Sequence, residues 1–311
     1  MTIGSDFKAL TTHAPLAWQR RLYEGAFAKG DIPTAIDVPT GLGKTSVMAL
    51  WLIGRAHGAS LPRRLAYVVD RRAVVDQATD EAIKLREALE GEAKYLKTSL
   101  SLDGALPIST LRGQFVDNKE WLVDPAAPAI IVGTVDMIGS RLLFEGYGVS
   151  RRMRPYHAGF LGVDTLIVLD EAHLVPPFAH LLRAIETDPA LWPRAVADRA
   201  LLPPFKLLPL SATQRGRAQA QQPPFRLDAR DSDEITDRRL KASKTLRFEP
   251  LEDKEHDMLL AKAAFDLARR NNENARVVIF CERRAKKDDG AGPSAEGVAQ
   301  ALEDLAKADK K

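Results

Sequence analysis

Two short groups of residues, far apart in the chain, have types and spacing that suit phosphate chemistry. The first, residues 38–45, is a glycine-containing run that ends in lysine and threonine, VPTGLGKT. The second, residues 170–173, is a pair of carboxylates followed by alanine and histidine, DEAH. Runs of the first kind surround phosphate with backbone N–H groups, whereas carboxylates of the second kind handle a magnesium ion and a water molecule. Together they predict a nucleoside triphosphatase site.

In the first group, the glycines and the two polar residues at the end have separate expected roles. Gly41 and Gly43 permit a tight turn and a close approach of the backbone to phosphate. Lys44 is expected to hold the β- and γ-phosphates of ATP, and Thr45 to ligate Mg²⁺ through its hydroxyl. The other predicted nucleotide-binding residues of this run are Pro39, Thr40 and Leu42. A chance Gly-Lys-Thr in an ordinary turn is the alternative, which the strand-like run before it disfavours.

In the second group, the two carboxylates are expected to have different chemical roles. Asp170 is predicted to bind Mg²⁺ through water, and Glu171 to orient and deprotonate the attacking water. The predicted catalytic residues are therefore Lys44 and Glu171. His173 has two interpretations: a hydrogen-bonded histidine at a strand end, or a residue that couples the nucleotide site to a second domain.

Both groups follow apolar runs that read as strands, residues 34–38 and 165–169, so each is expected at the carboxyl end of a strand. Further strand-like runs cover 65–69, 106–110, 129–132 and 207–210. Helices are expected over 44–56, 72–90 and 135–144, the last one capped by Thr134. Short apolar strands that alternate with helices are typical of a parallel sheet covered on both faces. Residues 1–240 are therefore predicted to form an α/β, RecA-like P-loop NTPase domain.

The composition changes after this region. Residues 214–239 are rich in Arg, Gln, Asp and Pro and are expected to form a connector. A new α/β pattern follows, with strands at 245–248 and 276–281 and helices at 257–270 and 294–306. Because so short a segment cannot bury a sheet by itself, residues 241–311 are expected to be the incomplete start of a second RecA-like lobe.

Composition excludes several other classes of protein. A hydrophobic content of 45% is normal for a globular chain, and a net charge of +3 argues only weakly for a nucleic-acid partner. One cysteine, Cys281, and six histidines leave no thiolate metal cluster and no disulfide framework. The sequence shows no pattern that predicts a secretory leader, and no apolar stretch approaches the ~20 residues that a membrane span needs. We therefore expect a cytoplasmic protein with no membrane partner.

The set of motifs resembles that of superfamily 2 helicases of the DEAH/DExH type. Val38, where the general phosphate loop has glycine, is typical of the helicase version. Trp18-Gln19 resembles the upstream glutamine motif, which implies that Gln19 reads adenine. Residues 211–213, SAT, resemble the motif that links hydrolysis to domain movement. The resemblance thus implies coupling roles for Ser211 and Thr213, and favours the coupling role for His173.

A finer resemblance is to the CRISPR-associated type I helicase–nuclease, in its subtype U (or G) branch. It rests on residues 67–77, YVVDRRAVVDQ, and on residues 146–155, GYGVSRRMRP. It implies ATP-driven movement from 3′ to 5′ on single-stranded DNA, after a guide-RNA effector complex has opened the target. In that family a metal-dependent HD nuclease domain then degrades the DNA.

Two departures from that family limit what we expect of this chain. The final helicase motifs, with the arginines that reach the γ-phosphate from the second domain, have no counterpart before Lys311. The pair His256-Asp257 has no second His and Asp cluster to complete a nuclease site, so a solvated helix start is expected there. The chain alone is therefore expected to bind nucleotide with weak or absent hydrolysis.

Contacts with nucleic acid are expected along two motifs that resemble backbone-contacting motifs, residues 68–72 and 133–136, and along a loop over the DNA path at 146–162. Aromatic residues are sparse there, so we expect tracking of the backbone without base readout. The predicted DNA-binding residues are Arg71, Arg72, Thr134, Arg141, Arg151 and Arg152, with Arg154 beside them. Ordinary solvated surface charge is the alternative for each arginine.

Two other functions remain open at this stage. The shared motifs also suit the motor subunit of a restriction enzyme or another DEAD/DEAH-box helicase. A remnant that binds nucleic acid without hydrolysing ATP belongs to a different class. If the chain is such a remnant, Lys44→Ala should leave the biological activity unchanged. If the chain is a motor, Lys44→Ala should abolish that activity.

Overall fold

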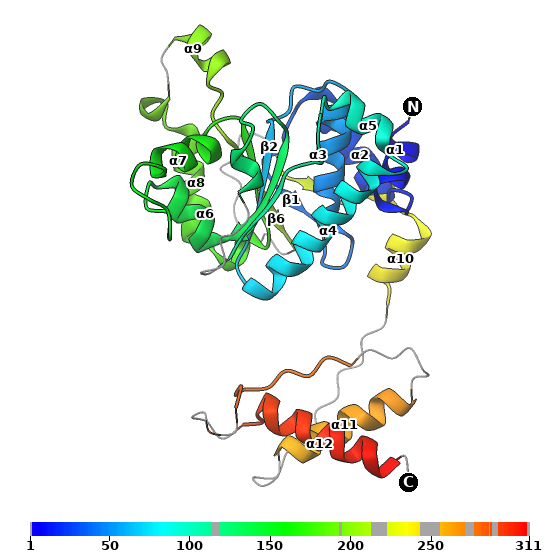
Figure 1. The fold of residues 1–311 in the computed structure, drawn as a ribbon. Coiled ribbons are helices and arrows are strands. Elements are labelled where there is room, and N and C mark those ends of the chain that lie inside the picture. The colour runs from blue at the N-terminus through cyan, green and yellow to red at the C-terminus, as the bar shows by residue number, and fades with distance from the viewer. Residues whose placement is uncertain are drawn as a thin grey trace. The chain divides into compact units, whose positions relative to one another are not determined.

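The computed structural model describes residues 2–112, 119–192, 195–212, 223–242, 256–270, 277–285, 287 and 292–309. The chain divides into two compact units, Met1–Ala242 and Ser243–Lys311. The first unit contains a seven-stranded sheet in the order β3-β4-β2-β5-β6-β1-β7, and every strand pair in it is parallel (Figure 1).

The strands of this sheet lie at the apolar runs of the sequence, with one addition. They are β1 Ile36–Asp37, β2 Arg64–Val69, β3 Ile108–Leu111, β4 Ala129–Thr134, β5 Thr165–Leu169, β6 Lys206–Ser211 and β7 Phe225–Arg226. Every residue of β2, β4 and β5 is buried, as expected for central strands with both faces covered. The addition is β7, which pairs with β1 and lies where we expected only a connector.

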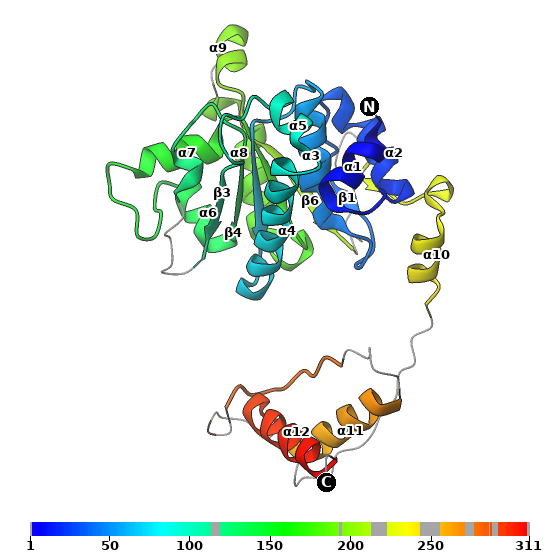
Figure 2. The ribbon, with the colours of Figure 1, turned by 45° about the vertical axis from the view of Figure 1, so that its right-hand side comes forward.

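Helices cover both faces of the sheet, which confirms the predicted fold class. Helices α1 Ile3–Thr11, α2 Ala17–Gly25, α3 Val47–Ala56, α4 Arg72–Glu90 and α5 Lys94–Ser99 lie on one side. Helices α6 Val135–Leu142, α7 Arg154–Gly162 and α8 Pro176–Thr187 lie on the other (Figures 1 and 2). Two further helices are α9 Val196–Leu201 and α10 Glu234–Leu240.

Alternate residues of a strand point to opposite faces, so each strand contributes to two cores. In β2, Leu65 and Tyr67 belong to the core under α1–α5, whereas Ala66 belongs to the core under α6–α8. In β5, Leu166 and Ile167 divide in the same way. This double burial holds the carboxyl ends of β1 and β5, and the motifs that follow them, in fixed positions.

Two segments expected to be irregular contain regular structure. The loop expected over 146–162 ends in helix α7, with Pro155 in its first turn and Phe160 and Leu161 buried against the second core. The connector expected over 214–239 contains β7 and most of α10. In both segments, the few apolar residues whose contacts determine the local structure stand among glycines or charged residues. The sequence pattern therefore does not reveal the regular elements there.

In the second unit, helices α11 His256–Arg270 and α12 Ala295–Asp309 pack through Ala261, Val298 and Ala301. The strand expected at 276–281 is wrong for its described part: residues 277–281 are irregular, with Val278 74% and Phe280 87% exposed. No described strand of this unit lies beside that segment to pair with it. The strand expected at 245–248 lies outside the described residues.

The start of α11 has a structural contact that agrees with a helix-end interpretation of His256-Asp257. Asp257 accepts hydrogen bonds from the N–H and the hydroxyl of Ser294, at 2.6 and 3.0 Å, beside the start of α12. Among the described residues, no group of three or more His, Cys, Asp and Glu side chains could hold a metal ion. Nor does any helix in the described ranges have the length and apolar character that crossing a membrane requires.

Candidate nucleotide site

The glycine-containing run forms a turn at the carboxyl end of β1. Its first residue, Val38, donates its backbone N–H to Ser211 O at 3.0 Å, which continues the pairing of β1 with β6. Gly41 and Gly43 have φ angles of 86° and 75°, in the region that favours glycine. A Cβ on Gly43 would lie only 3.2 Å from Gln19 Nε2. The turn leads through the 3-10 segment Lys44–Ser46 into α3.

The two predicted catalytic side chains are in contact at the edge of the sheet where the carboxyl ends of β1 and β5 lie. Lys44 Nζ donates to Glu171 Oε1 at 2.8 Å, and Lys44 is only 7% exposed. Glu171 follows β5 and adopts a φ of 45°, a conformation that is uncommon for a residue with a side chain. Its other oxygen, Oε2, lies 3.4 Å from His173 Nδ1.

The two predicted Mg²⁺ ligands are joined by a residue that sequence reasoning did not single out. Tyr67, on β2, donates its hydroxyl to Asp170 Oδ2 at 2.9 Å and also shares a side-chain hydrogen bond with Thr45. Burial raises the pKa of Asp170 above its ordinary value, while the Tyr67 hydrogen bond opposes that rise. Burial and the neighbouring Asp170 raise the pKa of Tyr67 well above its ordinary value. A hydroxyl and a carboxylate gathered in this way form an oxygen-donor set of the type that Mg²⁺ prefers.

The predicted coupling residues lie beside the acidic pair. Ser211, at the end of β6, is buried, and its hydroxyl lies 3.3 Å from His173 Nδ1. His173 therefore stands between Glu171 and Ser211, within 3.4 Å of both. Thr213 lies outside the described residues.

Side chains of helix α2 form hydrogen bonds with the phosphate loop. Gln19 is 4% exposed, and its Nε2 donates to Ser46 Oγ at 2.8 Å and to Gly43 O at 3.4 Å. Its Oε1 accepts from the backbone N–H of Leu16 at 2.8 Å. The structure thus joins Gln19 to the loop, while its reading of adenine stays a prediction. The adjacent Trp18 donates its indole N–H to Leu42 O at 3.1 Å.

A second support comes from α10 and the residues before it, which sequence reasoning treated as a connector. Arg239 donates to Gly41 O at 2.5 Å. Asp233 accepts from the backbone N–H of Ala17, the first residue of α2, at 3.0 Å. Arg21, also on α2, pairs with the buried Asp231 at 2.6 Å. No sequence pattern signals these contacts, because about 200 residues separate their partners.

The predicted DNA-binding residues fall into different environments. The side chain of Arg71 is 77% exposed, and Arg151 and Arg152 are exposed as well. Thr134 is 6% exposed and accepts from Met137 N at 3.4 Å, which confirms its role as the cap of α6. The side chain of Arg72 lies outside the described part of the molecule.

The prediction that Arg141 contacts phosphate is wrong for the conformation observed. Arg141 is fully buried, and burial lowers the pKa of its guanidinium. Its NH1 donates to Met137 O at 2.8 Å and its NH2 to Tyr147 O at 3.3 Å. Arg141 therefore holds the backbone of the loop that follows α6 from the inside of the domain.

A parallel sheet with a phosphate loop after one strand and an acidic pair after another defines a P-loop nucleoside triphosphatase domain. A family model described as "Type III restriction enzyme, res subunit" matches residues 12–214, and the chain belongs to this family.

Several solved structures are similar to this chain. The DEAD-box helicase Mss116 bound to ssRNA and UDP-BeF is 16% identical, with a TM-score of 0.44 over 67% of this chain and 38% of its own. The DUF1998 helicase MrfA bound to DNA and AMPPNP is 16% identical, with a TM-score of 0.45 over 68% of this chain and 27% of its own. T. fusca Cas3-AMPPNP is 18% identical, with a TM-score of 0.41 over 68% of this chain and 23% of its own.

This chain therefore spans well under half the length of each of these structures. Comparison with curated protein sequences gives no significant match.

Proposed function

We propose that this chain is the nucleotide-binding lobe of an ATP- and Mg²⁺-dependent translocase that acts on single-stranded DNA. The observation that carries the proposal is the meeting of Lys44 with Glu171 at 2.8 Å, at the carboxyl ends of β1 and β5. A cation from a glycine turn beside a carboxylate that can orient water is the combination that phosphoryl transfer to water requires. Tyr67, which bridges Thr45 and Asp170, supports the same proposal.

In this mechanism, Lys44 exchanges one negative partner for another. Its ammonium leaves the Glu171 carboxylate and binds the β- and γ-phosphates of ATP, supported by the backbone N–H groups of residues 40–45. Glu171 is then free to orient the attacking water and to accept its proton. Thr45 and Asp170 would hold Mg²⁺, which would neutralise charge on the phosphate oxygens.

His173 and Ser211 provide a route from this site to a second domain. His173 lies within 3.4 Å of both Glu171 and Ser211, so a change at the Glu171 carboxylate reaches Ser211, the last residue of β6, through the imidazole of His173. We propose that this link couples hydrolysis to movement, and that residues 241–311 begin the second RecA-like lobe. A DNA motor acts where DNA lies, so we also propose a cytoplasmic location.

Two pathways fit this motor. Residues 67–77 and 146–155, with their resemblance to the CRISPR-associated helicase–nuclease, favour a role in CRISPR interference and a guide-RNA effector complex as partner. The family match to the res subunit of type III restriction enzymes favours a restriction motor. DNA-stimulated ATP turnover that requires a guide-RNA complex on its target supports the first pathway. Turnover that requires a restriction recognition site and no guide RNA supports the second.

The central test is binding of a non-hydrolysable ATP analogue with Mg²⁺, measured by titration calorimetry on the full chain. Lys44→Ala is expected to weaken binding by roughly 10-fold to 100-fold, because a hydrogen bond to a charged group is lost. Lys84→Ala is the matched control, since Lys84 also pairs with a carboxylate, Glu81, but on the exposed face of α4. Equal affinities of the wild type and Lys44→Ala overturn the proposed nucleotide site and favour a remnant that does not use ATP.

A further inference from the structure

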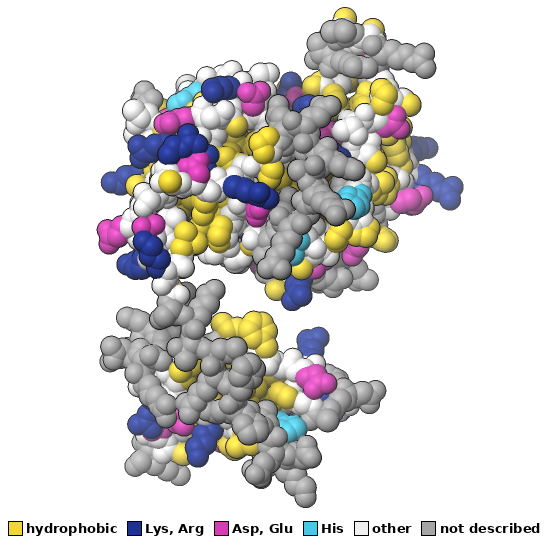
Figure 3. Space-filling view, turned by 180° about the vertical axis from the view of Figure 1, so that it is seen from behind, with side chains coloured by type: hydrophobic (Ala, Val, Ile, Leu, Met, Phe, Trp, Pro, Cys, Tyr) yellow, Lys and Arg dark blue, Asp and Glu magenta, His cyan; other side chains and the backbone are white. Residues whose placement is uncertain are grey.

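Large apolar side chains reach the surface of the first unit at several places, and Figure 3 shows hydrophobic atoms between charged groups on the face seen from behind. One group of them is local in sequence. It lies in the segment that leaves α6 and enters α7, residues 143–156, which we call the arginine–aromatic loop. Its exposed members are Leu143 (47%), Phe144 (57%), Tyr147 (61%), Met153 (39%) and Tyr156 (41%).

The backbone of this loop is held in place from three sides. The buried Arg141 donates to Tyr147 O at 3.3 Å. Gly146 packs so closely that a Cβ there would lie 2.9 Å from side-chain carbons of both Arg141 and Val149. Arg154 closes the loop by pairing with Glu145 at 2.8 Å. Tyr147 is therefore exposed on a fixed backbone and does not lie in a collapsed apolar cluster.

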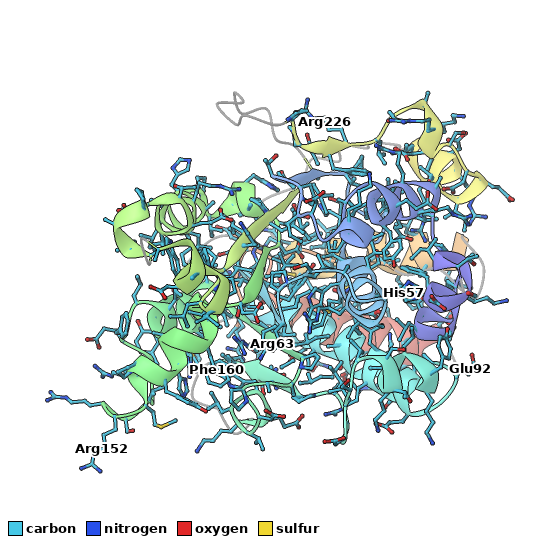
Figure 4. The ribbon with its side chains drawn as sticks, turned by 90° about the horizontal axis from the view of Figure 1, so that it is seen from above. His57, Arg63, Glu92, Arg152, Phe160 and Arg226 are labelled. Atoms are coloured by element: carbon cyan, nitrogen blue, oxygen red, sulfur yellow. The ribbon has the colours of Figure 1, made fainter. Side chains whose placement is uncertain are left out.

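The loop is also basic. Residues 143–156 contain three arginines and one glutamate, with no lysine or aspartate. Because Glu145 is paired with Arg154, the charges of the exposed Arg151 and Arg152 are not balanced within the loop. Figure 4 shows Arg152 extending away from the body of the domain, whereas Phe160 lies among packed side chains.

We propose that the arginine–aromatic loop is a stacking site for single-stranded DNA, in which bases stack on Phe144 and Tyr147 and phosphates bind Arg151 and Arg152. The inference rests on the proposed function, because it assigns a further contact surface to the same motor. Exposed rings and unbalanced guanidinium groups in one short loop match a polyanion that carries flat apolar bases. A protein partner would need acidic groups for the arginines, whereas single-stranded DNA supplies both kinds of group.

This proposed site changes the expectation that the protein contacts only the backbone of the DNA. Of the aromatic residues in the segment 146–162, Tyr147 and Tyr156 are exposed and Phe160 is buried, and Phe144, just before that segment, is exposed as well. Stacking on an aromatic ring does not discriminate strongly between bases, because every base has a π-face. The loop therefore binds bases without discriminating between sequences.

The test compares two labelled oligonucleotides of equal length by fluorescence anisotropy on the full chain. One is oligo-dT, and the other is an abasic strand that keeps the phosphates but lacks bases. Tyr147→Ala and Phe144→Ala are each expected to weaken binding of oligo-dT by about fivefold or more, and to change binding of the abasic strand by less than about twofold. Tyr147→Phe, which keeps a ring, is the matched control and is expected to bind both strands as the wild type does.

The arginines give a second, independent readout. The double variant Arg151→Gln with Arg152→Gln is expected to weaken binding of both strands. It should also lower the slope of log affinity against log salt by about 1.4, because each lost phosphate contact on a single strand contributes ~0.7.

Three results overturn the inference while the proposed function stands. One is oligo-dT affinity that neither aromatic variant changes. Another is an equal loss on both strands, which indicates a disturbed loop fold. The third is self-association of the wild type that Tyr147→Ala abolishes, which identifies a second copy of the chain as the occupant. If the wild type binds neither strand although it binds nucleotide, both the loop site and the DNA-translocase proposal fail.

Discussion

Lys44 Nζ lies 2.8 Å from Glu171 Oε1, so the cation of the phosphate loop and the carboxylate after β5 neutralise each other. Any phosphate that Lys44 binds must therefore compete with this carboxylate. The exchange links nucleotide binding to the release of Glu171, which makes the carboxylate available for water only when phosphate is present. The pair thus connects the binding step and the chemical step of the proposed mechanism.

Replacing Glu171 by Gln is expected to separate these two steps. Without the carboxylate charge, Lys44 binds phosphate unopposed, and analogue affinity should rise by about twofold to fivefold, the range of a partly exposed ion pair. Whatever single-turnover hydrolysis the wild type shows should fall by about 10²–10⁴-fold, because the group that accepts the proton of water is lost. Glu81→Gln, in a surface pair on α4, is the control for charge alone. Weaker analogue binding by Glu171→Gln would contradict the competition argued here.

Tyr67→Phe tests the bridge between Thr45 and Asp170. The substitution keeps the ring in the core and removes only the hydroxyl that donates to Asp170 Oδ2 at 2.9 Å. A buried hydrogen bond contributes about 1 kcal/mol, so the Mg²⁺ concentration at half-saturation of nucleotide binding should rise by about fivefold. Nucleotide binding measured without Mg²⁺ serves as the control and should not change. An unaltered Mg²⁺ dependence would mean that Thr45 and Asp170 are positioned without Tyr67.

The parts of the fold and site that sequence predicts are those with strong local signals. Six strands and helix α4 appear as runs of apolar or amphipathic residues, and the glycine turn and the acidic pair follow strands directly. The missed parts depend on distant partners. Strand β7 is two residues long and exists because Ile36 and Asp37 offer it an edge. The burial of Arg141 depends on the loop that folds over it, and the role of Tyr67 depends on the register of β2 beside β5.

Arg239→Ala tests whether α10 positions the phosphate loop. Arg239 donates to Gly41 O at 2.5 Å from the exposed surface, so its loss should affect the turn more than the core. Analogue affinity is expected to fall by about threefold to tenfold, less than a buried charge-assisted hydrogen bond would give because Arg239 is exposed, while the melting temperature changes by less than about 2 °C. Arg238→Ala, at the neighbouring exposed position of the same helix, is the matched control. The same loss in both variants would assign the effect to general charge and not to the contact with Gly41.

His157 gives the fold a pH dependence that can be measured without any ligand. It lies in α7 at 7% exposure with its ring 5.2 Å from that of Trp121, and burial, with Arg141 and Lys119 nearby, lowers its pKa from 6.5 to about 4. Between these two pH values the unfolded chain binds a proton that the folded chain does not. The contribution of His157 to the free energy of unfolding is therefore fully present above pH 6.5 and is lost as pH falls towards 4.

His157→Phe should remove this part of the pH dependence while it keeps the edge contact with Trp121. From pH 7 to pH 5, urea unfolding of the wild type is expected to lose roughly 1–2 kcal/mol more than that of the variant. His13→Phe, at an exposed position, is the control for the loss of a histidine elsewhere in the chain. Parallel pH profiles of the wild type and His157→Phe would show that the imidazole of His157 takes up a proton as readily in the folded chain as in the unfolded one.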